Sequence, residues 1–191
     1  MNIESVEKKL REAEYFLAQM REQEIRAFGD KEPFDFQLSA FLNAGRTVGY
    51  RLCHLHGSAY KAWRKRWNAS NPKDDDLIKF FADDRDIDVH QLGSSREVKQ
   101  KAVPVRGHYS DKSGSMEVFS TPLPLANAHD VPPDERHAVI HKPAYFFTID
   151  GAEQKATEAC AGYLDSLKRM VAQFRADNVG DKCGQTCGNV R

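Results

Sequence analysis

The chain has 191 residues, which suffices for one well-filled hydrophobic core and leaves little room for a second full domain. Its 28 basic and 28 acidic side chains cancel at pH 7, so there is no net charge to attract nucleic acid or anionic lipid, and any polyanion site must be local. The charged amino-terminal residues lack the apolar run of a signal peptide, and no stretch is long and apolar enough to cross a bilayer. We therefore expect a soluble, cytoplasmic protein with no membrane partner.

Two long helices are predicted in the first third of the chain. Apolar residues at spacings of three and four predict an amphipathic helix from about residue 4 to residue 27. A second apolar series starts after Pro33 and stops at His56 and Gly57, which predicts another helix. Arg46 lies within the apolar face of this second helix. A charge there needs a partner, such as an aspartate of the third helix, or else it lines a cleft.

The pattern of a third helix follows a segment rich in aromatic and basic residues. That segment, residues 60–67, reads YKAWRKRW, and NPKDDD then supplies a proline and acidic residues for a helix start. The third helix carries FFADDRDIDVH, residues 80–90. The clearest amphipathic pattern of the chain, at residues 152–176, predicts the last helix.

Between residues 96 and 150 the pattern changes to β-prone runs separated by turn signals. These runs predict a small antiparallel hairpin or sheet inserted before the last helix. The expected fold is therefore mainly α, an antiparallel bundle of about four helices with a small antiparallel β-hairpin insert. We expect one domain over residues 1–179, with the β-rich insert at about 96–150, and a flexible tail over 180–191.

The third helix carries an arginine, Arg85, followed five positions later by His90, near its predicted end. The order of segments is FDFQLSAFLNAGRTVGYRL, FFADDRDIDVH, a β-prone insert, YFFTID and a long final helix. This order resembles the HEPN-domain family, and in particular a group of uncharacterised bacterial HEPN-like proteins. Ribonuclease members of that family carry an arginine followed four to six residues later by a histidine. The family commonly has asparagine directly after the arginine, where this chain has Asp86.

The resemblance implies metal-independent RNA cleavage of the toxin or defence type, with Arg85 and His90 as the catalytic pair. In that reaction the ribose 2′-hydroxyl attacks the adjacent phosphate, which the arginine holds, while histidine transfers protons. One histidine cannot easily serve as both base and acid, so a homodimer would supply two. The resemblance further implies RNA as substrate and a protein antitoxin as a partner.

Two other interpretations of these residues remain open. Arg85 can instead be a structural residue that neutralises nearby aspartates such as Asp84 and Asp88, in a HEPN-like module that binds a nucleotide, RNA or protein without catalysis. A local RNA-binding surface is a second hypothesis, in which aromatic rings of residues 60–67 stack on bases and basic side chains hold phosphates. In the opposite interpretation the aromatic rings belong to the core and the basic side chains face water. The candidate RNA-binding residues are Arg46, Lys61, Arg64, Lys65 and Arg66.

Metal ligands are sparse in the sequence. The pairs His54/His56 and His137/His141 have no second cluster at a recognisable spacing, and Cys183 with Cys187 forms a lone pair in the polar tail. Four scattered cysteines do not form a disulfide framework, so we expect reduced thiols. We therefore expect no metal and no other cofactor.

Overall fold

The computed structural model describes residues 3–25, 31–90, 94–109, 116–119 and 136–179. Within these residues, four helices and four strands follow one another. They are α1 (Glu4–Ile25), α2 (Lys31–Ser70), α3 (Pro72–His90), β1 (Glu97–Tyr109), β2 (Met116–Phe119), β3 (Arg136–Ile149), β4 (Ala152–Lys155) and α4 (Ala156–Val179). This order confirms the predicted class, a mainly helical bundle with a small antiparallel β insert.

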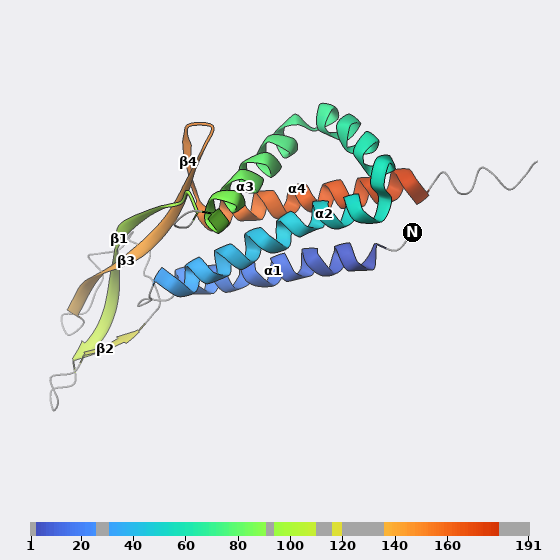
Figure 1. The fold of residues 1–191 in the computed structure, drawn as a ribbon. Helices are drawn as coiled ribbons and strands as arrows, with labels where there is room; N and C mark the ends of the chain where they lie inside the picture. The colour runs from blue at the N-terminus through green and yellow to red at the C-terminus, as the bar shows by residue number, and fades with distance from the viewer. Residues whose placement is uncertain (1–2, 26–30, 91–93, 110–115, 120–135, 180–191) are drawn as a thin grey trace, which may run out of the picture.

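The helices pack around a single apolar core. Helix α1 lies along the first half of α2, and α4 runs beside both (Figure 1). The predicted apolar face of α1 is buried, from Val6 through Leu10 and Leu17 to Met20. Tyr163 of α4 lies at the centre, where its ring stacks on Phe81 of α3 with 4.7 Å between ring centroids. The core therefore joins all four helices.

Helix α2 continues beyond the point where the sequence predicted its end. The helix is kinked at Gly57, whose φ of 52° and ψ of −124° are not helical, and then runs on to Ser70. The predicted end of the first helical run thus coincides with a break at Gly57, but the sequence did not predict the second helical stretch that follows it. A positive φ favours glycine because other side chains clash with their own backbone there. Beyond the kink, α2 turns away from α1 and leads into α3 (Figure 1).

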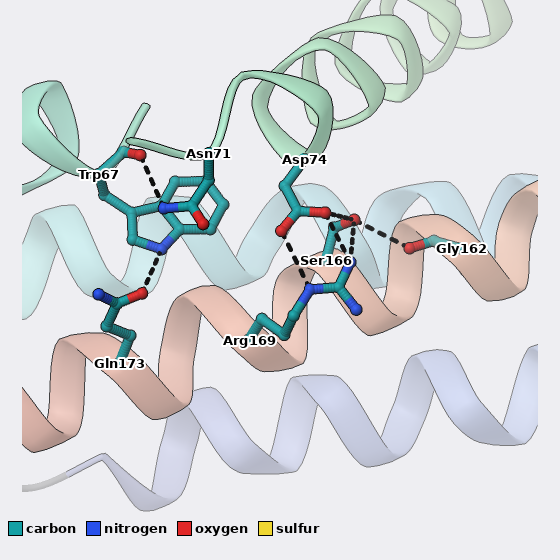
Figure 2. A network of polar contacts seen from close by, with 7 residues as sticks. All are labelled: Trp67, Asn71, Asp74, Gly162, Ser166, Arg169 and Gln173. Atoms are coloured by element: carbon teal, nitrogen blue, oxygen red, sulfur yellow. Dashed lines mark hydrogen bonds and ion pairs between the residues drawn. The ribbon is translucent and has the colours of Figure 1, made fainter. Parts of the chain in front are cut away.

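Polar contacts hold the turn between α2 and α3 against α4 (Figure 2). The indole of Trp67 donates a hydrogen bond to the side chain of Gln173, with 3.1 Å between the two atoms. The side chain of Asn71 donates to the backbone carbonyl of Trp67 at 3.0 Å, and Pro72 opens α3 as predicted. The second half of α2 is thus fixed to α4 at its far end.

The first turn of α3 is anchored by an ion pair (Figure 2). Arg169 donates from Nε and Nη2 to the carboxylate of Asp74, and the hydroxyl of Ser166 donates to the same carboxylate at 2.9 Å. The hydrogen bond from Arg169, which has the largest effect, and the one from Ser166 hold the pKa of Asp74 below its usual value. Helix α3 therefore packs on α4 through charge as well as through apolar contacts.

The β insert forms a four-stranded antiparallel sheet in the order β2-β1-β3-β4, rather than a single hairpin. Asp150 and Gly151 form a two-residue turn with positive φ at both positions, which joins β3 to β4. Residues 152–155 pair with β3 and are strand, so the last helix begins at Ala156 and not at 152 as predicted. The turn brings residues 152–155 into pairing with β3, although the sequence pattern had assigned them to the helix.

Alternate side chains of β3 attach the sheet to the bundle. Tyr145, Phe147 and Ile149 are buried, and the ring of Tyr145 stacks on Phe34 of α2 with 3.6 Å between centroids. The paired strands β1 and β3 then extend beyond the end of the bundle (Figure 1). No helix within the described residues is long and apolar enough to span a membrane. The predicted tail, 180–191, lies outside the described residues.

Candidate functional site

Arg85 lies on the surface at the junction of α3 and α2. Its Nε donates a hydrogen bond to the side-chain oxygen of Asn43 in α2 at 3.1 Å, and its Nη1 donates to Asp86 at 3.1 Å. The side chain keeps 27% of its surface exposed. Asn43 thereby fixes the guanidinium of Arg85 in place. Because Asn43 is neutral, this contact does not compensate the charge of the guanidinium.

A second arginine reaches the same carboxylate. Nη2 of Arg46 lies 3.6 Å from Oδ2 of Asp86, and the Arg46 guanidinium also sits over the ring of Tyr50 at 5.2 Å. The expectation that Arg46 needs an aspartate of the third helix is thus confirmed. Asp86, which is about half exposed, thus contacts two guanidinium groups. We call Asn43, Arg46, Arg85 and Asp86 the arginine cluster.

Asp84, one of the two aspartates predicted as partners of Arg85, contacts the segment that precedes β1. Asp84 is buried and accepts a hydrogen bond from the backbone N–H of Ser95 at 2.6 Å, so it anchors the segment that leads into β1. The side chain of Asp88 lies outside the described residues. The described partner of Arg85 on α3 is its neighbour Asp86. Asp86 holds the position at which the HEPN-domain family, which the sequence resembles, commonly has asparagine.

His90 is the last residue of α3, and its side chain lies outside the described residues. The backbone is helical from Arg85 to His90 without a break. Residues five apart on a helix point roughly 140° away from each other. A site that joins Arg85 to a histidine at this position therefore calls for a second copy of the chain.

Two other arginine–histidine pairs share the same spacing. Nη1 of Arg51 donates to the carbonyl of Ser5 at 2.6 Å, and the ring of His56 packs on Phe174 with 5.0 Å between centroids. These residues join α2 to α1 and α4, so the first pair is structural. The side chains of the second pair, Arg136 and His141, lie outside the described residues.

The aromatic and basic side chains of residues 60–67 separate on folding. Tyr60, Trp63 and Trp67 are buried, so their rings cannot stack on bases, and the interpretation that they belong to the core is confirmed. The side chains of Lys61, Lys65 and Arg66 are exposed, and contact of these three with RNA stays a prediction.

Arg64 turns inward instead. Its Nη2 donates to Asp75 at 3.1 Å, and its guanidinium covers the ring of Trp67 at 4.6 Å. Asp75 is buried and also contacts Lys79 at 2.7 Å. Arg64 is therefore not part of the exposed basic face, although the sequence grouped it there.

A cavity of about 290 Å³ opens between the two halves of α2, α3 and α4, next to the arginine cluster. Arg46, Arg64, Tyr50 and Tyr60 contribute to its lining together with apolar side chains. Burial raises the pKa of Tyr60, so that side chain is neutral at neutral pH. The sequence did not predict this cavity, because it depends on the kink at Gly57 and on the placement of three helices.

The solvent face of α2 beside the arginine cluster is neutral. It presents residues at spacings of three and four, with exposed aromatic rings at both ends and small or amide side chains between them. Phe36 is 67% exposed and Tyr50 is 61% exposed. We call this set the α2 stripe; its members are Phe36, Ala40, Asn43, Thr47 and Tyr50.

Within the described residues, no three His, Cys, Asp or Glu side chains gather as a metal site would require. Comparison of the chain with family models, curated proteins and solved structures gave no match. The arginine cluster, the cavity and the position of His90 are the features that bear on function.

Proposed function

We propose that this protein is a HEPN-like, metal-independent endoribonuclease of the toxin or defence type that acts as a homodimer. The observation that carries the proposal is the arginine cluster. In it, Asn43 of α2 holds the partly exposed Arg85, and Arg46 lies beside them. Arg85 belongs to α3, the helix that ends at His90. Two guanidinium groups meet at this position, and such a pair suits the oxygens of an RNA phosphate.

The chemistry assigns a role to each residue. The 2′-hydroxyl of the ribose attacks the phosphorus, the P–O5′ bond breaks, and a 2′,3′-cyclic phosphate forms. His90 of one copy takes the 2′-hydroxyl proton, and His90 of the other copy gives a proton to the leaving 5′-oxygen. Arg85, with Arg46 beside it, stabilises the charge that develops on the phosphate oxygens. Lys61, Lys65 and Arg66 lie exposed on the second half of α2, where they would contact the RNA backbone.

A second candidate, a HEPN-like module that binds without catalysis, is favoured by one observation. Asp86 contacts both arginines and so occupies the position that a phosphate would take. In this alternative the carboxylate is a permanent partner and the chain serves as a scaffold for RNA, a nucleotide or a protein such as an antitoxin. The two candidates differ in what removal of the Asp86 charge should do.

The test is cleavage of mixed RNA by the purified protein in EDTA, followed by analysis of the RNA ends. We expect 2′,3′-cyclic phosphate ends, and we expect Arg85→Ala and His90→Ala each to lower the cleavage rate about a hundredfold or more. Asp86→Asn should raise the rate, because it removes the carboxylate that competes with phosphate for both guanidinium groups.

Matched controls separate catalysis from folding. Lys61→Ala removes an exposed charge on the same helix as Arg46, so it should reduce the rate only a few fold. All variants should keep the melting temperature of the parent within a few degrees. If no RNA is cut by the parent chain or by Asp86→Asn, the catalytic proposal fails and the binding module is favoured.

A further inference from the structure

The cavity beside the arginine cluster has a lining that the ribonuclease proposal does not use. It has a volume of about 290 Å³, and it lies in the angle that the kink at Gly57 creates between the two halves of α2. Arg46 contributes from one half and Arg64 from the other. None of the described residues that line it is acidic. The cavity therefore has a guanidinium group on two sides, each of which also contacts an aspartate outside the lining.

Both arginines carry a nitrogen atom without a partner. Nε of Arg46 and Nη1 of Arg64 are buried and have no hydrogen-bond acceptor among the described residues. Nη2 of Arg46 lies 3.5 Å from the Tyr50 hydroxyl and 3.6 Å from Asp86, and Nη2 of Arg64 donates to Asp75 at 3.1 Å. A buried N–H without an acceptor costs about 1–3 kcal/mol, so each of these atoms favours a ligand that brings one.

The rest of the wall is apolar. Ile78 and Ala82 of α3 contribute to it, together with Leu167 and Met170 of α4. Gly49 of α2 adds empty space, because a Cβ atom there would have no neighbour closer than the Tyr60 hydroxyl at 3.9 Å. These surfaces favour a flat or aliphatic carbon skeleton.

We propose that this cavity binds a small organic anion, namely a carboxylate or sulfonate with a flat apolar body. Its volume corresponds to the lower end of small-molecule sites, which begin at roughly 300 Å³, so the ligand is compact. Two guanidinium groups select the negative charge, and the apolar walls offer few partners for the hydroxyl groups of a sugar. The proposal does not rest on RNA cleavage, because binding is measured without RNA.

The probe for the site is 8-anilinonaphthalene-1-sulfonate, whose fluorescence rises when it leaves water. We expect saturable binding to the native protein and displacement by 2-naphthoate. The neutral analogue 2-naphthalenemethanol has the same rings without the charge, so it should displace the probe about tenfold more weakly or worse, which corresponds to 1.4 kcal/mol or more.

Variants test the location of the site. Arg46→Gln and Arg64→Gln should each weaken binding of 2-naphthoate about tenfold or more, and Gly49→Leu should abolish it by filling the cavity. Arg66→Gln is the matched control, because this arginine lies on the same helix with an exposed side chain and should leave binding unchanged. Melting curves establish that each variant is folded. If Arg64→Gln fails to fold through loss of its pairing with Asp75, Arg46→Gln and Gly49→Leu still decide the question.

Three outcomes would overturn the proposal. They are equal displacement by the neutral alcohol, retention of probe binding by folded Gly49→Leu, and displacement by adenosine monophosphate at lower concentration than by 2-naphthoate. A chain that binds 2-naphthoate and cuts no RNA would refute the ribonuclease proposal alone. A chain that cuts RNA and binds no probe would refute the cavity proposal alone.

Discussion

Gly45 and Gly49 lie one turn apart on α2 and face different surroundings. A Cβ atom at Gly45 would lie 2.6 Å from Cε1 of Tyr163, which real side chains do not tolerate, whereas the same atom at Gly49 would meet nothing within ordinary contact distance but the Tyr60 hydroxyl. Gly45 therefore permits the packing of Tyr163 at the centre of the core. Gly49 instead leaves space for the cavity.

This contrast gives a paired prediction. Gly45→Ala should lower the free energy of unfolding by about 1–3 kcal/mol, because Tyr163 is stacked on Phe81 and cannot move aside. Gly49→Ala should be neutral or should raise it by about 0.5–1 kcal/mol, since alanine favours the helix and meets no clash. Urea denaturation of both variants measures the difference. Equal stability of the two would show that Tyr163 yields easily.

At the level of single residues, the sequence predicted a contact where burial of a charge requires a partner. A charge on the apolar face of a helix must find a partner, and Arg46 lies 3.6 Å from Asp86 of the third helix. The sequence did not predict that the Arg64 side chain points inward. Its basic neighbours at 61, 65 and 66 have the same charge, and only the placement of Asp75 distinguishes Arg64 from them. Spacing along the chain does not reveal such tertiary pairings.

At the level of elements, the start of α3 was predicted correctly from the sequence. Pro72 with the acidic residues after it opens α3, because proline and carboxylates both suit the first turn of a helix. Gly57 was read as a helix end, yet the chain resumes its helix after one glycine, since Tyr60, Trp63 and Trp67 provide a second apolar face to bury. Strand β4 was missed because its pairing depends on the turn at Asp150 and Gly151.

The contact between α3 and α4 gives a prediction with a pH dependence. Asp74→Asn should lower the free energy of unfolding at pH 7 by about 1–2 kcal/mol, at the low end for a charged contact because Arg169 is largely exposed. The folded-state pKa of Asp74 lies below its ordinary value of 3.8, so its contribution is present above that pH and is lost as the pH falls through the lower folded value.

Denaturation midpoints between pH 7 and pH 2 measure this effect. The difference between the parent and Asp74→Asn should shrink toward the acid end. Asp76→Asn is the control, because this carboxylate is 69% exposed and lies 4.0 Å from its lysine partner, so little change is expected. A gap between parent and variant that stays constant to pH 2 would contradict the assigned role of the Asp74 charge.

At the scale of the whole molecule, the ribonuclease proposal requires a dimer with two-fold symmetry. The α2 stripe presents two exposed aromatic rings on either side of Asn43, which itself holds Arg85. A second copy packed on this stripe would bring two arginine clusters together, and an isologous interface places the same patch on both subunits.

Light scattering should therefore give the mass of a dimer at a protein concentration of tens of micromolar. A specific homodimer of ordinary affinity persists in this concentration range. Phe36→Glu should yield a monomer that remains folded, because it places a charge in the interface and nothing in the core. Tyr15→Glu on α1 is the matched control, with a ring 60% exposed outside the stripe, and should stay dimeric. A monomeric parent chain would contradict the dimer.

The sheet also bears on how the bundle assembles in time. Helices α1 and α2 are neighbours in sequence, so their contact forms with little loss of chain entropy, whereas α4 reaches α3 only after residues 91–155 have been bridged. The antiparallel pairing of β1 with β3, from Glu97 opposite Phe146, brings the two ends of that long insertion together. The backbone contact between Ser95 and Asp84 ties the near end to α3. Because this pairing shortens the effective loop that α4 must close, we expect the β1–β3 pair to form before α4 docks on α3 or together with it.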